Sequence, residues 1–134
     1  IGIPFSDPQA DGPIIQQSSQ LALDNGITIK QIFDQVIEIR KRSNVPLALM
    51  GYFNPILKMG YDCFLEHCTE AGVDGLILPD LPLDEAKPFC ELSKSKGISP
   101  ILLVAPNTSN DRIRKISKLK VVYGKIINCM IYIR

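Results

Sequence analysis

Residues 45–82 read VPLALMGYFNPILKMGYDCFLEHCTEAGVDGLILPDLP, and they contain a complete strand–helix–strand pattern. The continuous apolar run Val45–Met50 is typical of a strand that is buried on both faces. The next apolar run, Gly75–Leu78, predicts a second buried strand that ends at Pro79-Asp80. Between them lies one helical stripe, closed by Gly72 and formed by Tyr61, Phe64, Leu65, Cys68 and Ala71. This order predicts two parallel strands joined by a helical crossover.

The same alternation continues toward the C-terminus. Asp84 is a candidate N-cap for another helix, which Gly97 ends. Ser99–Val104 predicts a third strand, and Ile113 with Ile116 marks a last short helix.

Two helices are predicted upstream of Val45. Pro13 suits the first turn of a helix that runs to about Leu23, where Asn25-Gly26 closes it. Thr28 followed by Gln31 forms a capping-box pattern, and the apolar spacing after it predicts a helix to about Arg42.

Alternating strands and helices leave two architectures open, an open doubly wound sheet and a closed barrel. No Gly-x-Gly-x-x-Gly follows any strand, which removes the main support for a dinucleotide-binding sheet. A complete (β/α)₈ barrel needs roughly 250 residues, and this chain has 134. Because the chain opens in the middle of a strand pattern, we expect a partial chain, with two open sheet edges if it is half a barrel.

Composition excludes several classes of protein. The net charge is +1, whereas nucleic-acid binders usually carry a strongly basic face. No apolar run is long enough for a transmembrane helix, so no membrane partner is expected. The cysteines form no Cys-x-x-Cys pair, which favours a reducing cytoplasm, and Cys63, His67 and Cys68 do not share a helix face as metal ligands would.

Sites in parallel α/β folds lie at the carboxyl ends of the strands. Here the segments 4–13, 51–55, 79–82 and 105–107 occupy that position. Their polar candidates are Asp7, Asp11, Tyr52, Asn54, Asp80 and Asn107. Each also has a structural interpretation, because aspartates close turns or cap helices and a buried tyrosine needs only one hydroxyl partner. Spacing alone therefore predicts a parallel α/β enzyme without naming its substrate.

The run Gly2-Ile3-Pro4-Phe5-Ser6-Asp7-Pro8-Gln9-Ala10-Asp11-Gly12-Pro13 closely resembles the signature of the tryptophan synthase alpha subunit. Further matches follow in order, in Met50–Pro55, Ala71–Gly75, Leu78–Pro82 and Ala105–Asn107. The resemblance covers residues 1–119, so we expect a partial (β/α)₈ barrel there and a divergent tail at 120–134.

The resemblance implies a cytoplasmic lyase that cleaves indole-3-glycerol phosphate by retro-aldol chemistry into indole and glyceraldehyde 3-phosphate, without a cofactor or metal. It implies that the Asp11 carboxylate faces the indole nitrogen as a catalytic group. It also implies that Tyr52, Met50, Ile77 and Leu103 line the substrate pocket, although core packing is an equal explanation for the last three. A beta subunit that uses pyridoxal phosphate is the implied partner, in a heterotetramer, with Asp7 and Asn54 in the contact segments.

The sequence departs from the family pattern at both ends. The family glutamate that exchanges protons with substrate would stand one position before Ile1, and no glycine-rich phosphate loop occurs in these residues. After Leu119 the family pattern is lost, although Tyr123 is a candidate for a pocket tyrosine. We therefore expect little activity from these residues alone. Two alternatives stay open, a non-catalytic module that docks on the beta subunit and another phosphate-binding barrel enzyme.

Overall fold

The structure is a computed structural model that describes residues 1–104, 107–119 and 131–132. Its strands are β1 (Ala48–Met50), β2 (Gly75–Ile77), β3 (Ser99–Ile101), β4 (Leu103–Val104) and β5 (Ile131–Tyr132). The first three form a parallel sheet in the order β1-β2-β3, and β4 pairs in parallel with β5. A parallel bridge between Gly2 and Met50 places the N-terminal segment beside β1. The predicted parallel α/β class is confirmed.

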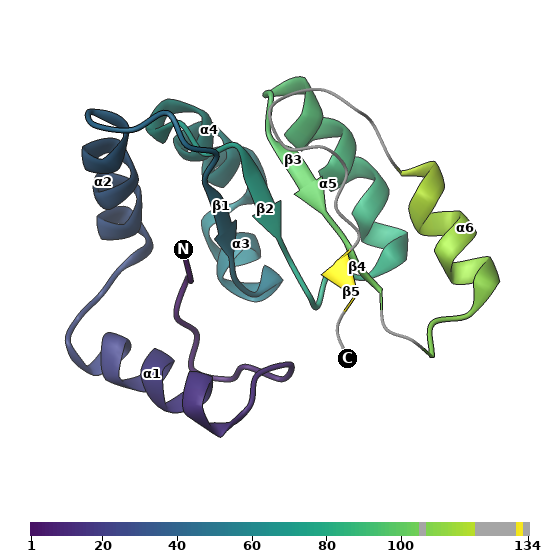
Figure 1. The fold of residues 1–134 in the computed structure, drawn as a ribbon, viewed down its shortest axis with the longest axis horizontal. Coiled ribbons are helices and arrows are strands. Elements are labelled where there is room, and N and C mark those ends of the chain that lie inside the picture. The colour runs from purple at the N-terminus through teal and green to yellow at the C-terminus, as the bar shows by residue number, and fades with distance from the viewer. Residues whose placement is uncertain (105–106, 120–130, 133–134) are drawn as a thin grey trace.

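The helices are α1 (Pro13–Asp24), α2 (Ile29–Arg40), α3 (Phe53–Met59), α4 (Tyr61–Ala71), α5 (Leu83–Ser95) and α6 (Asn110–Lys118). Helix α4 packs between α2 and α5, and α5 also packs on β3. Figure 1 shows α1 apart from these helices, near the carboxyl ends of β1 and β2. The capping box at the start of α2 is confirmed, because the Gln31 backbone N–H donates to the Thr28 hydroxyl and the Thr28 N–H donates to the Gln31 side chain.

The two faces of the sheet have different surroundings. Leu49 and Leu76 are neighbours in the β1–β2 register, and both are almost completely buried beneath the helices. Burial of one such side chain stabilises the fold by about 1.5–3 kcal/mol. Met50 pairs with Ile77 in the next register position, and Met50 is 39% exposed. The prediction that β1 is buried on both faces is therefore wrong for the part of the chain that the structure describes, where helices cover the Leu49 face and Met50 on the other face is exposed.

The third predicted strand is not continuous. Residues 99–104 divide at Leu102, where the chain leaves β2 as its partner and pairs with β5 instead. The run therefore forms β3 and β4 in two different sheets. Its apolar character is compatible with either arrangement, because the change depends on a partner that lies far along the chain.

Helix α3 was not predicted, and it begins within the segment 51–55 that was expected at the carboxyl end of a strand. Pro55 lies in its first turn, where a missing N–H costs nothing, and Gly60 with φ of 87° ends it. Asp84 is not the N-cap of α5, because Pro82 holds that position without a side-chain cap. Asp84 lies in the first turn instead, where its charge is favourable to the helix dipole.

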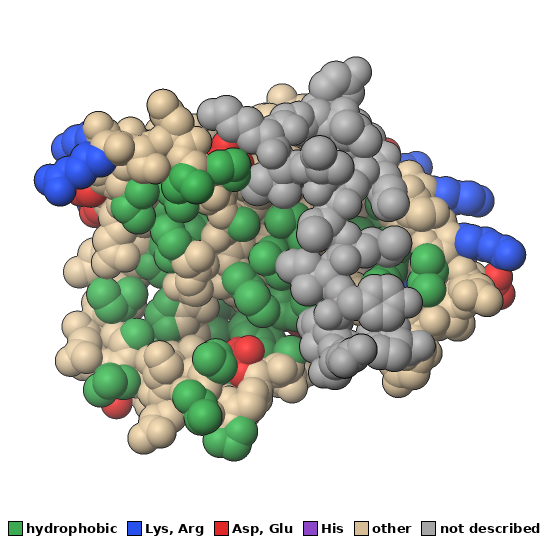
Figure 2. Space-filling view, viewed as in Figure 1, with side chains coloured by type: hydrophobic (Ala, Val, Ile, Leu, Met, Phe, Trp, Pro, Cys, Tyr) green, Lys and Arg blue, Asp and Glu red, His purple; other side chains and the backbone are tan. Residues whose placement is uncertain are grey.

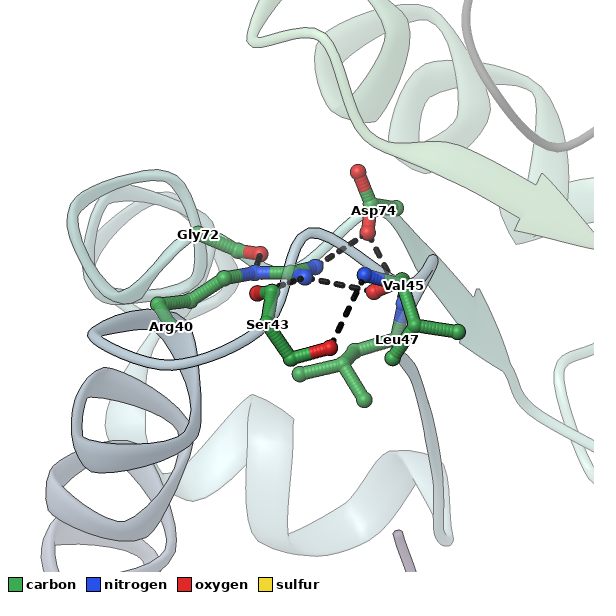
Figure 3. Close-up of polar contacts among 6 residues, drawn as sticks. All are labelled: Arg40, Ser43, Val45, Leu47, Gly72 and Asp74. Carbon is green, nitrogen blue, oxygen red and sulfur yellow. Dashed lines mark hydrogen bonds and ion pairs between the residues drawn. The ribbon is translucent and has the colours of Figure 1, made fainter.

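A polar cluster around Arg40 joins α2 to the amino ends of β1 and β2 (Figure 3). The Arg40 guanidinium donates to the Gly72 carbonyl at 2.8 Å and to the Val45 carbonyl at 2.5 Å, and it pairs with the Asp74 carboxylate. Asp74 also accepts from the Leu47 N–H at 2.8 Å. This cluster lies at the end of the sheet opposite to the candidate site, where a role in stability is expected.

Some expectations concern other regions of the chain. Among the described residues, none of the helices has the length and apolar character of a membrane span. Cys63, Cys68 and Cys90 are free thiols, and the described His, Cys, Asp and Glu side chains form no group of three that could hold a metal ion. Cys129, Tyr123 and the loop residues 105–106 lie outside the described residues, as does most of the predicted tail at 120–134.

Candidate active site

A cavity of about 670 Å³ lies between α1 and the carboxyl ends of β1 and β2. Ligand pockets commonly have volumes of about 300–1,000 Å³. The lining residues are Ile1, Gly2, Ile3, Pro4, Asp11, Ile15, Ser18, Ser19, Ala22, Ala48, Met50, Gly51, Tyr52, Ile77 and Pro79. In Figure 2 hydrophobic side chains occupy the middle of the viewed face, and Lys and Arg side chains lie toward its ends. The lining of the cavity is largely apolar and therefore suits an apolar ligand.

Asp11 supplies the carboxylate of this cavity. The Tyr52 hydroxyl donates a hydrogen bond to Asp11 Oδ2 at 3.0 Å, and it accepts one from the Ala10 N–H at 2.9 Å. The Asp11 side chain is therefore tied to the end of β1 by a residue from a different segment. This differs from the turn-closing interpretation, in which an aspartate binds its own loop.

Tyr52 is itself held firmly. It is 5% exposed, and its ring lies 5.5 Å from the ring of Phe5, measured between centroids. Burial is the main cause that raises the pKa of Tyr52 above its ordinary value of 10.0, and its hydrogen bond to Asp11 and the Asp11 charge raise the pKa further. The phenol therefore stays protonated at neutral pH and can donate to the carboxylate.

The backbone on both sides of Tyr52 is bonded to the β2 side of the sheet. The Gly51 N–H donates to the Ile77 carbonyl at 3.1 Å. The Phe53 N–H donates to both oxygens of Asp80, at 2.9 and 3.1 Å. Asp80 thus caps a helix that precedes it in the chain rather than its own following turn.

The predicted pocket residues only partly come together. Met50, Tyr52 and Ile77 line the same cavity as Asp11. Leu103 is not among the lining residues, because β4 has left the sheet of β1–β3. Asn107 does not line it either. The predicted partner-contact residues Asp7 and Asn54 are both exposed.

Helix α1 contributes lining residues that the sequence interpretation missed. Ile15, Ser18, Ser19 and Ala22 face the cavity. Their spacing of three, four and seven residues marks one face of a helix, and the small side chains leave room for a ligand. Gln16, from the same helix, donates to the Asp11 carbonyl at 2.8 Å. The helical spacing of Ile15, Ser18, Ser19 and Ala22 is the feature of the sequence from which this lining face could have been predicted.

The residues that line the cavity offer few charged groups. Among the described residues that line the cavity, no side chain carries a positive charge, and Asp11 is the one carboxylate. An ionised carboxylate in an apolar wall can accept an N–H hydrogen bond and stabilise a positive charge that develops on a ligand. These lining residues include no Lys, Arg or His, the side chains whose positive charge favours binding of a phosphate group.

Comparison with protein families gives a match over residues 1–126 to the model of the tryptophan synthase alpha chain. The chain is 55% identical over 119 residues to the tryptophan synthase alpha chain of Petrotoga mobilis, covering 89% of this chain and 46% of that protein. It is 51% identical over 120 residues to that of Flavobacterium psychrophilum, covering 89% and 47%. The chain thus spans about half the length of the curated relatives it matches.

Solved structures give the same result. The fold is similar to a chain of the tryptophan synthase complex of Pyrococcus furiosus, with a TM-score of 0.84 and 44% identity over 88% of this chain and 49% of the other. It is also similar to the separate A-subunit from the same organism, with a TM-score of 0.85 and 43% identity over 90% and 49%. Of the two predicted architectures, the barrel is therefore confirmed, and the chain represents about half of a (β/α)₈ barrel.

Proposed function

The chain belongs to the tryptophan synthase alpha chain family, and on that premise we propose that it forms part of a lyase of tryptophan biosynthesis that cleaves indole-3-glycerol phosphate. The products are indole and glyceraldehyde 3-phosphate. The observation that carries this proposal is the position of Asp11, whose carboxylate lines an otherwise largely apolar cavity at the carboxyl ends of the strands.

The reaction breaks the bond between indole carbon 3 and the first carbon of the glycerol chain. A proton is added to indole carbon 3, and another is removed from the hydroxyl on the glycerol carbon, which becomes the aldehyde. Protonation of carbon 3 places positive charge on the indole nitrogen. The Asp11 carboxylate would accept the N–H hydrogen bond and stabilise that charge, more strongly in an apolar cavity than in water.

The other lining residues support a binding role. Met50 and Ile77 form an apolar row from neighbouring strands, on which an indole ring can pack. Tyr52 closes the same wall beside Asp11. Leu103 does not line this cavity, and its proposed role in substrate binding requires a complete barrel that brings it to the pocket.

The remaining parts of the reaction need groups outside this lining. A second proton-transfer group and a phosphate site are required, and the described lining residues contain neither. We therefore propose that residues 1–119 provide one part of the barrel, with the indole end of the site. The 120–134 segment is proposed to be a divergent tail.

A beta subunit is the proposed partner, and the cytoplasm is the proposed location. A relative of known structure is described as the tryptophan synthase a2b2 complex of Pyrococcus furiosus. Asp7, in the loop before α1, and Asn54, in the first turn of α3, are both exposed at the carboxyl end of the sheet, where a partner could reach them. The exposure of these two residues also supports the second candidate function, a module that docks on the beta subunit without catalysis.

Indole release distinguishes the two functions. The full chain, as its gene encodes it, is incubated with indole-3-glycerol phosphate, alone and with a tryptophan synthase beta subunit. We expect indole to be released in proportion to the enzyme and to increase with the partner. Binding to the beta subunit without any indole release, in either condition, would overturn the lyase and favour the docking module.

A further inference from the structure

We propose that Asp80 is a positioning residue for Asp11, acting through the backbone and hydroxyl of Tyr52. The proposal rests on the function proposed above, because it assigns a role within the same site. Asp80 does not line the cavity. It acts on the residue that holds the Asp11 carboxylate, and therefore touches neither substrate nor reacting atoms.

The need for Asp80 begins at the start of α3. The first N–H groups of a helix have no partner inside the helix and require an acceptor. Tyr52 is the N-cap residue, and its side chain makes no cap hydrogen bond; its hydroxyl, at the far end of the ring, bonds to Asp11. The Phe53 N–H would then be unpaired in a place where Tyr52 and Phe53 are each only 5% exposed. Asp80 supplies the missing acceptor from the end of the neighbouring strand.

This arrangement fixes Tyr52 from both sides. The Gly51 N–H donates to the Ile77 carbonyl, and the Phe53 N–H donates to the Asp80 carboxylate. Asp80 follows Ile77 by three residues, so both acceptors belong to one segment. Two hydrogen bonds one residue away on either side leave the backbone of Tyr52 little freedom. The phenol then projects from a fixed point, with its ring packed on Phe5.

The fixed phenol in turn determines where Asp11 lies. The Tyr52 hydroxyl bonds to the Asp11 carboxylate and to the Ala10 N–H, so it holds the side chain and the adjacent backbone together. Loss of the Asp80 contact should let the start of α3 shift and loosen both bonds. A displacement of about 1 Å at a catalytic group can reduce the rate by about a hundredfold.

The kinetic test uses the full chain with its beta subunit and two substitutions of Asp80. Asp80→Ala removes the acceptor, and Asp80→Asn retains one oxygen for the Phe53 N–H. We expect Asp80→Ala to reduce kcat about ten- to a hundredfold, with a KM change below about threefold. Asp80→Asn should stay within about threefold of the parent. Equal losses in both variants would mean that the charge matters rather than the position, and would overturn the proposal.

A double-mutant cycle tests the route through Tyr52. Tyr52→Phe keeps the ring and removes only the hydroxyl. In that background Asp80→Ala should lower kcat by less than about twofold, because the link to Asp11 is already broken. An undiminished effect of Asp80→Ala in the Tyr52→Phe background would show that Asp80 acts by another route. Asp84→Ala is the matched control, since Asp84 is exposed in the first turn of α5, and its kcat should be unchanged.

A measurement that does not depend on enzyme activity tests the positioning role of Asp80 independently of the proposed lyase function. Ultraviolet titration of the parent, minus that of Tyr52→Phe, isolates the ionisation of Tyr52 in the folded chain. Asp80→Ala should shift that ionisation to lower pH than Asp80→Asn does, because only the alanine variant lets the phenol leave its buried position, and burial is the largest cause that raises its pKa. If the parent releases no indole but this difference appears, the function fails and the positioning role stands. If indole is released and the two variants titrate alike, the positioning role fails.

Discussion

Ile3 and Gly51 lie so close together that a Cβ built on Gly51 would stand 2.8 Å from the Ile3 Cβ. Real Cβ atoms almost never approach a neighbour that closely. The contact joins the N-terminal segment to β1 directly beside Tyr52, and the Ile3 N–H reinforces it by donating to the Met50 carbonyl at 2.7 Å. Glycine at position 51 is therefore required by tertiary packing rather than by its own backbone angles.

Gly51→Ala should destabilise the fold by about 1–3 kcal/mol, because the added methyl group must displace the buried Ile3 or the segment that carries it. Urea denaturation of the full chain measures this loss. Gly2→Ala is the control, since no atom lies within 4 Å of the position that its methyl group would take, and it should stay within about 0.5 kcal/mol. Equal stability of the two variants would contradict the packing argument.

Arg40→Leu should destabilise the fold by about 2–4 kcal/mol. The substitution removes the guanidinium donor of the Gly72 and Val45 carbonyls and the charge partner of Asp74, which keeps only the Leu47 N–H. Hydrogen bonds to charged groups contribute about 1.5–3 kcal/mol. Thermal or urea unfolding gives the measurement. Lys41→Leu, the neighbouring control, breaks only an exposed pair with Glu38 and should change stability by less than about 1 kcal/mol. A loss for Lys41→Leu as large as that for Arg40→Leu would refute the special role of the Arg40 cluster.

Asp11→Asn should lower kcat for indole release by about 10²–10⁴. The amide keeps the shape and an acceptor oxygen but removes the negative charge that stabilises the protonated indole, so KM should change much less. Steady-state kinetics of the full chain with its partner provide both constants. Asp24→Asn, at the end of α1, is expected to behave as the parent. An Asp11→Asn enzyme with unchanged kcat would restrict Asp11 to a structural role.

Two buried thiols predict an alkaline loss of stability. Burial raises the pKa of Cys68 to about 12 and that of Cys90 to about 11, above the ordinary value of 9.0, so the unfolded chain releases these protons first as the pH rises. The stabilisation is complete below pH 9 and declines as the pH rises toward 11 and 12. Unfolding curves between about pH 8 and pH 11 test this, and Cys68→Ala should decline less steeply than the parent. Identical slopes would exclude Cys68 as a cause.

Asp7→Arg and Asn54→Arg should weaken binding to a beta subunit by about tenfold or more. Both positions are exposed at the carboxyl end of the sheet, where a large charged side chain would oppose a docked surface. Calorimetric titration of the full chain with the beta subunit provides the affinity. Glu38→Arg, which lies at the other end of the sheet near the C-terminus of α2, should bind normally. Normal binding by the Asp7 and Asn54 variants would place the interface elsewhere.

The comparisons also settle one of the open alternatives. Another phosphate-binding barrel enzyme was compatible with the strand and helix order, but the match to the alpha chain family extends over residues 1–126. The carboxyl-end segments were predictable because parallel strands direct their ends to one edge. Met50, Tyr52 and Ile77 meet Asp11 there, and this grouping follows from topology as much as from sequence.

The sequence by itself determined the parallel α/β class and the starts of α1 and α2, and its resemblance to the family selected Asp11 as the candidate carboxylate. These are local properties, since helical spacing, capping residues and a continuous motif are all read within a few positions. Only the tertiary structure decided which residues hold Asp11 in place. Tyr52 and Gln16 reach Asp11 from a strand end and from a helix, and Asp80 bonds to the Phe53 N–H beside Tyr52 from a neighbouring strand end. The division of residues 99–104 between two sheets has the same cause, because a hydrogen-bond partner that is distant in the chain leaves no mark on the local pattern.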